Sequence, residues 1–81
     1  MLPNQNLNKE DALWLLNEFQ PLIGGTVFGK NVGMYTKAIN LIRGTNAGNP
    51  GCSCEYKLHA QVAQSLFGQH KSSIEEVANA V

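Results

Sequence analysis

The stretch GGTVFGKN at residues 24–31 has the glycine and lysine spacing of a phosphate-binding loop. In such a loop, backbone N–H groups at a helix N-terminus cradle phosphates, while a serine or threonine hydroxyl binds magnesium. Asn31 stands where that hydroxyl is required, and the preceding residues have helical periodicity instead of that of a strand. We therefore expect no nucleotide hydrolase. A weaker hypothesis is that Gly25, Gly29, Lys30 and Asn31 hold a small phosphorylated ligand. The alternative is a glycine turn between helices.

The only two cysteines, Cys52 and Cys54, lie in the sequence GCSCEYKLH. With His59 they could supply three metal ligands, although a C-x-C-x4-H spacing matches no common zinc module. A second interpretation is redox chemistry, because a thiol in the first turn of a helix favours the thiolate and a bridge across one residue is strained. A third is that both side chains pack where a loop enters a helix. The sequence leaves all three open.

Helical periodicity accounts for most of the chain. Asn8 is a good N-cap for a helix that Pro21 ends or kinks, and glycines form the loop that follows. A second helix is predicted at about 32–43, with Gly44 as its C-cap.

After the turn-forming residues 44–51, a third helix is predicted at about 54–67. Gly68 is expected to stop it, and Ser72 to begin a short fourth helix over 72–81. The predicted fold is all-α: three longer helices plus a short C-terminal helix, with a Gly-rich loop between helices 1 and 2. Residues 1–7 are expected to form a flexible N-terminal arm, and residues 8–81 a single helical domain.

The composition argues against several classes of partner. Six basic residues balance six acidic residues, which disfavours tight binding to the phosphates of nucleic acid. The segment over 62–81 has a helix-turn-helix pattern, but Glu75 and Glu76 would repel phosphate. No apolar run approaches the roughly 20 residues that span a bilayer. We expect no secretion signal and a location in the cytoplasm or within a virion.

The residues around NPGCSCE, 49–55, resemble short uncharacterised helical proteins of tailed bacteriophages. This resemblance implies a virion or accessory protein, or one that blocks a host defence, and it assigns no functional residue.

The sequence favours a non-enzymatic interaction protein that acts as a homo-oligomer or as a small subunit of a larger assembly. Charged residues are only 15% of the chain, and the first helix has a wider apolar face than so short a chain is expected to bury. The expected interface anchors are the large rings of Trp14, Phe19, Phe28 and Tyr35. The chain contains no motif for catalysis or for a resident cofactor, so we expect neither. The alternatives are a small-ligand module at the Gly-rich loop and a zinc or thiol site at the two cysteines.

Overall fold

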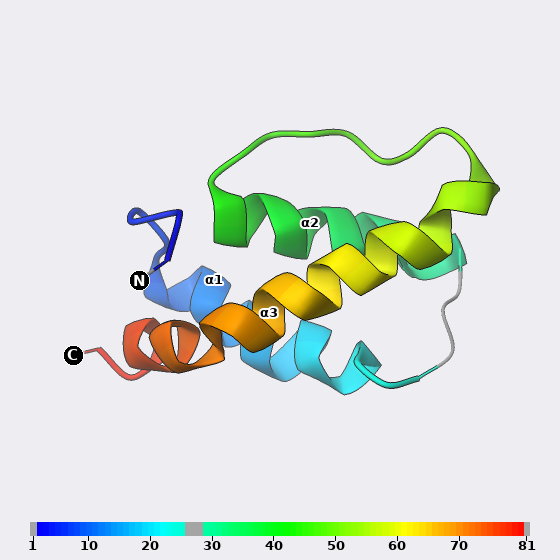
Figure 1. Ribbon diagram of the computed structural model, residues 1–81. Coiled ribbons are helices and arrows are strands. Elements are labelled where there is room, and N and C mark those ends of the chain that lie inside the picture. The colour runs from blue at the N-terminus through cyan, green and yellow to red at the C-terminus, as the bar shows by residue number, and fades with distance from the viewer. Residues whose placement is uncertain (1, 26–28, 81) are drawn as a thin grey trace.

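The computed structural model describes residues 2–25 and 29–80, and every regular element in these two ranges is helical (Figure 1). The prediction of an all-α fold is therefore confirmed for the described residues. The helices form three runs: the first covers residues 9–22, the second 29–43 and the third 53–78. Within the described ranges, no helix is both long enough and apolar enough to cross a membrane.

The first run begins with α1, Lys9–Trp14. Asn8 caps it as predicted, because its side-chain oxygen accepts a hydrogen bond of 2.8 Å from the Asp11 N–H.

A π-helical turn over Leu15–Phe19 and a 3-10 turn over Gln20–Leu22 complete the first run. Pro21 lies in the 3-10 turn and the run ends one residue later, at Leu22. Proline has no backbone N–H to donate and its ring crowds the preceding turn, which explains why regular α-helical bonding is abandoned just before it. Gly24, just after this run, has a left-handed backbone with a φ of 84°, which glycine adopts without strain.

The second run is a 3-10 turn over Gly29–Asn31 followed by α2, Val32–Arg43. The predicted bounds of this helix are confirmed. Gly44 ends it in the left-handed region, with a φ of 74°. Its predicted inward face is also confirmed, since four apolar side chains at helical spacing are all buried: Tyr35, Ala38, Ile39 and Ile42.

The third run is a 3-10 turn over Ser53–Glu55 followed by a single long helix, α3, Tyr56–Ala78. The predicted break at Gly68 is wrong, and so is the separate fourth helix starting at Ser72. A glycine inside a helix costs only about 1 kcal/mol relative to alanine. Burial exceeds that cost, because one continuous helix turns both predicted apolar segments to the same side. The buried residues of α3 are Ala60, Ala63, Phe67, Ile74 and Ala78.

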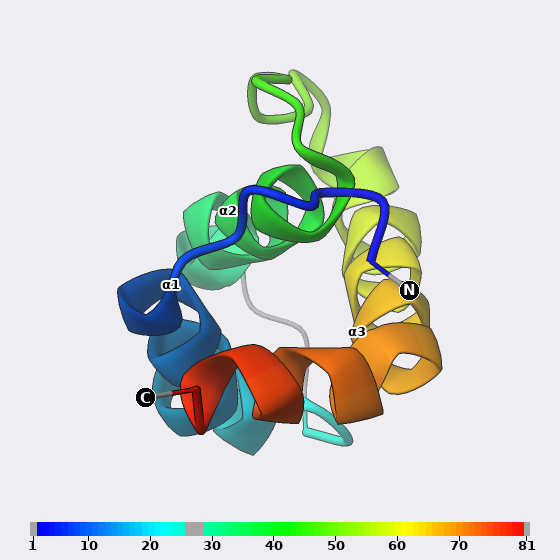
Figure 2. The ribbon, with the colours of Figure 1, turned by 90° about the vertical axis from the view of Figure 1, so that its left-hand side faces the viewer.

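Three aromatic rings, one from each helical run, meet at the centre of the molecule. Phe19 lies between Tyr35 and Phe67, with ring centroids 6.3 Å and 5.7 Å away and both pairs edge to face. All three rings are buried. Figures 1 and 2 show the corresponding arrangement of ribbons, in which α3 packs against both α2 and the first run. Burial of each ring contributes about 2–3 kcal/mol, which makes this cluster a main source of stability.

Residues 2–7 lie across the C-terminal end of α2 (Figure 2). The Asn4 backbone N–H donates to the Ile42 carbonyl at 3.1 Å, and both Leu2 and Leu7 are buried. Residues 2–7, which belong to the predicted N-terminal arm, therefore contribute two side chains to the core.

Candidate functional site

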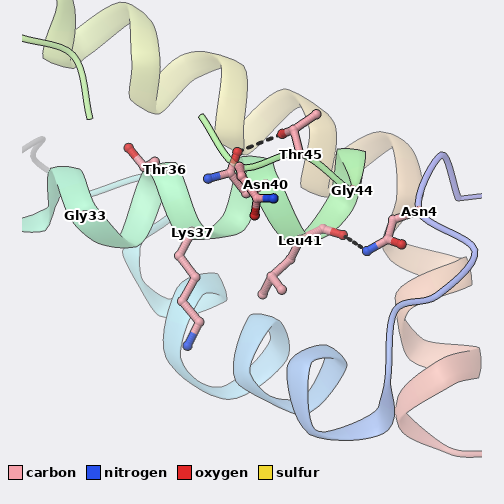
Figure 3. Close-up of a pocket in the computed structure, with 9 residues that line it drawn as sticks. Asn4, Gly33, Thr36, Lys37, Asn40, Leu41, Gly44 and Thr45 are labelled. Carbon is pink, nitrogen blue, oxygen red and sulfur yellow. Dashed lines mark hydrogen bonds between the residues drawn. The ribbon is translucent and has the colours of Figure 1, made fainter. Parts of the chain in front are cut away.

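A hollow of about 550 Å³ lies along α2 and reaches the loop that follows it (Figure 3). Most of the residues that line it have polar side chains, and one of them is charged: Asn4, Gly33, Thr36, Lys37, Asn40, Leu41, Gly44, Thr45 and Asn46. Pockets with a few convergent polar groups are the usual candidates for ligand binding. Whether this hollow suits a ligand depends on what its polar groups already contact.

The Asn40 side chain fastens the loop to the end of α2. Its oxygen accepts from the Thr45 hydroxyl at 2.7 Å and from the Ala47 N–H at 3.1 Å. Its nitrogen donates to the Ala47 carbonyl at 2.8 Å. The Asn40 carbonyl in turn accepts from the N–H groups of Gly44 and Thr45, at 2.7 and 3.0 Å. Asn40 thus has a structural role: it holds the loop residues Thr45 and Ala47 against the C-terminal end of α2.

Asn4, from the N-terminal segment, donates hydrogen bonds to carbonyls at the same end of α2. Its side-chain nitrogen donates to the Leu41 carbonyl at 2.7 Å, and its side-chain oxygen accepts from the Asn6 N–H at 3.0 Å. With the backbone bond to Ile42, Asn4 occupies two of the carbonyls that a helix C-terminus leaves without an intrahelical partner. The side-chain amides of Asn4 and Asn40 are therefore used in holding α2, its loop and the N-terminal segment together.

Lys37 also has a local partner. Figure 3 shows it pointing from α2 toward the first helical run, where its ammonium nitrogen lies 4.2 Å from the centroid of the Trp14 ring. This cation–π contact, with the stacking of Trp14 on Phe19 at 6.4 Å, accounts for the half-buried position of the indole.

The Thr36 hydroxyl is hydrogen-bonded to the His59 imidazole. The Thr36 Oγ1 and His59 Nε2 atoms lie 2.7 Å apart, a distance that would suit a nucleophile and its base. Thr36 is only 7% exposed, and the bond joins α2 to α3. The hydrogen bond therefore links two packed helices, and it leaves only a small part of the Thr36 side chain accessible from the hollow.

The predicted interface anchors divide into three groups. Phe19 and Tyr35 are core residues, and their rings are covered by other parts of the chain. Helical periodicity shows that a ring is on the apolar face but does not show which neighbours cover it. Trp14 keeps part of its surface exposed, and Phe28 lies outside the described residues.

The Gly-rich ligand hypothesis lies partly outside the described residues as well, because 26–28 separate Gly25 from the rest. Gly29, Lys30 and Asn31 form the 3-10 turn that enters α2. A β-carbon added at Gly29 would lie 3.2 Å from the Tyr56 ring, so this glycine permits close packing of the turn on the start of α3.

The two cysteines form a disulfide between residues 52 and 54. His59 is a turn further along and bonds to Thr36, so the three predicted metal ligands do not converge. Over residues 2–25 and 29–80, no three His, Cys, Asp or Glu side chains cluster closely enough to hold a metal ion. The structure pairs Cys52 with Cys54, which is the bridge that the redox interpretation included.

A partly exposed apolar row runs along α3, and we call it the α3 stripe: Leu58, Val62 and Leu66. Leu58 is 64% exposed, whereas Val62 and Leu66 are half-buried against the core. Their i, i+4, i+8 spacing places them on one side of the helix. The period of this row is visible in the sequence, but it runs beside the buried row Ala60, Ala63 and Phe67, and periodicity does not show which of two adjacent rows is covered.

Comparison with known proteins gives no match for this chain, whether to a protein-family model, a curated protein or a solved structure.

Proposed function

We propose that this protein is a non-enzymatic interaction protein that self-associates through the α3 stripe. The observation that carries the proposal is the 64% exposure of Leu58 at the head of a row that Val62 and Leu66 continue. Full burial of a leucine contributes about 1.5–3 kcal/mol relative to an exposed one. Covering this side chain with a second copy would recover much of that free energy.

The surroundings of the α3 stripe suit a helix from another copy. A hollow of about 400 Å³ lies on one side, lined by Arg43, Gln61, Val62, Ser65, Leu66 and Gln69. A smaller hollow of about 200 Å³ lies toward the N-terminal end of α3, lined by Pro50, Glu55, Leu58, His59 and Val62. Apolar residues between shallow depressions with polar edges form the pattern on which helices commonly dock.

The spacing of the α3 stripe is self-complementary. In an antiparallel pair of α3 helices with a two-fold axis at Val62, Leu58 of each copy faces Leu66 of the other. The chain carries no net charge, so two copies approach without long-range repulsion. The resemblance to short tailed-phage proteins suggests a virion or accessory assembly as the setting.

Sedimentation velocity over a wide concentration range tests this proposal. We expect the wild type to self-associate and Leu58→Asp to weaken association by at least about tenfold, because a carboxylate would lose hydration at the contact. Leu13→Asp is the matched control: Leu13 is the other large apolar side chain found exposed among the described residues, at 38%, and it lies on α1. A wild type that remains monomeric up to about millimolar concentration, or equal effects of the two substitutions, would refute the proposal.

A further inference from the structure

We infer that the Cys52–Cys54 disulfide is a thiol–disulfide exchange site, which accepts the thiol of a small molecule or of another protein and directs it to Cys54. This inference concerns chemistry at the start of α3 and does not depend on self-association through the α3 stripe.

The disulfide is open to attack. Both cysteines are exposed, and so are Gly51 and the residues of the preceding loop from Thr45 to Asn49. Figure 1 shows this loop as an arch that joins the C-terminal end of α2 to the N-terminal end of α3. An incoming thiolate needs in-line access to a sulfur atom, which buried structural disulfides deny.

The two sulfur atoms differ in their surroundings. The Cys52 Sγ accepts a hydrogen bond from the Cys54 N–H at 3.3 Å, and the Cys52 carbonyl accepts from the Glu55 N–H at 3.0 Å. Cys52 therefore occupies the N-cap position of the helical run that starts at Ser53, with its sulfur in the place that a serine or aspartate oxygen usually takes.

This position makes Cys52 the better leaving group. Negative charge on its sulfur would be stabilised by the hydrogen bond from the Cys54 N–H. The positive end of the α3 dipole acts on both cysteines, because both lie at the same helix start, so the hydrogen bond makes the difference. A sulfur that carries charge more easily leaves faster in exchange, so the attack falls on the Cys54 Sγ.

The exchange conserves atoms and electrons. A thiolate attacks the Cys54 Sγ and forms a mixed disulfide, while the bond between the two cysteines breaks and its electron pair goes to the Cys52 Sγ. A second thiolate attacks the outer sulfur of the mixed disulfide and releases Cys54 as a thiolate. The Cys52 and Cys54 thiolates then take up protons from the solvent. Two external thiols are oxidised to one disulfide, and the Cys52–Cys54 bridge is reduced.

A purely structural role explains the bridge less well. The stabilisation from a disulfide grows with the length of the loop that it closes, and this one closes a segment of three residues within a single helix start. It joins no separate elements, because Cys52 and Cys54 both belong to the start of the third helical run.

The test uses the oxidised full-length protein with millimolar reduced glutathione, quenched with acid at intervals and alkylated. Trypsin should release residues 44–57 as one peptide containing both cysteines, and mass spectrometry would locate the glutathione. We expect the mixed disulfide at Cys54 to exceed that at Cys52 by about tenfold at early times. No exchange within hours, or equal labelling of both cysteines, would overturn the inference.

Variants make the test independent of that peptide. In Cys52→Ser, which keeps an oxygen acceptor at the cap, mixed disulfide with oxidised glutathione should accumulate because the resolving thiol is gone. The double variant Cys52→Ser/Cys54→Ser should bind none, and circular dichroism should show unchanged helicity in both. If Cys52→Ser retains full helicity but forms no mixed disulfide, the inference is wrong.

A further arm separates the two sources of thiol. Oxidised wild type is mixed with reduced Cys52→Ser protein, whose single thiol is Cys54. A disulfide-linked dimer would show that a protein thiol can reach the site. Exchange with glutathione alone would assign the site to small thiols.

Discussion

The loop after α2 begins and ends in contrasting ways. At its start, Asn40, Asn4 and Gly44 satisfy the end of α2 with short hydrogen bonds and a left-handed backbone. At its other end, Glu55 precedes α3 without a side-chain cap, and the exposed disulfide lies just before it. The side-chain amides of Asn4 and Asn40 at the first end are bonded to neighbouring backbone and side-chain groups, so that end stabilises the fold. The second end remains chemically accessible.

The largest change in stability is expected from removing the Asn40 side chain at the C-terminal end of α2. Asn40→Ala deletes three side-chain hydrogen bonds to Thr45 and Ala47, and we expect the free energy of unfolding to fall by about 2 kcal/mol. Urea denaturation followed by circular dichroism measures this. Asn49→Ala is the control, because it removes an exposed amide of the same loop and should change stability by less than about 0.5 kcal/mol. Equal losses for the two variants would contradict the contrast.

Two glycines give the next test, with effects of opposite sign. Gly44→Ala should destabilise the protein by about 1–2 kcal/mol, because its φ is 74° and a β-carbon would lie 3.3 Å from the Asn4 side chain. Gly68→Ala should stabilise it by about 0.5–1 kcal/mol, since it lies inside α3 and a β-carbon would meet nothing within 4 Å. Thermal unfolding separates the two. Destabilisation by Gly68→Ala would argue against a continuous α3.

The second end gives the remaining test of the comparison. Replacing both cysteines with serine should lower the free energy of unfolding by less than about 2 kcal/mol, because the bridge constrains so short a segment. The same urea experiment, with and without reductant on the wild type, checks it. A loss as large as that of Asn40→Ala would show that the disulfide is a structural element after all.

Local signals in the sequence predicted the parts of the fold that local interactions decide. Asn8 was identified as a cap because an asparagine before a helical period satisfies free N–H groups, and Gly44 because few residues other than glycine tolerate its backbone angle. The role of Asn40 was missed, since an asparagine near a helix end looks the same whether or not a loop folds back onto it.

Local signals in the sequence did not predict the continuity of α3 at Gly68 or the burial of the large rings. The same residue type that ends α2 lies within α3, because burial of residues on both sides of Gly68 outweighs a propensity cost of about 1 kcal/mol. Phe19 and Tyr35 have the periodicity of an apolar face, but only the packing of three runs shows that this face is covered.

Local residue patterns were enough to predict the helical class of this protein, the bounds of α2 and the cap at Asn8, because each depends on residues within a few positions of one another. The packing of the three runs was needed to show that α3 is a single helix, that the rings of Phe19, Tyr35 and Phe67 face inward and that Leu58 remains outside. These outcomes depend on apolar surface that is buried between residues far apart in the chain. The periodicity of a short stretch of sequence does not show how much of that surface is buried.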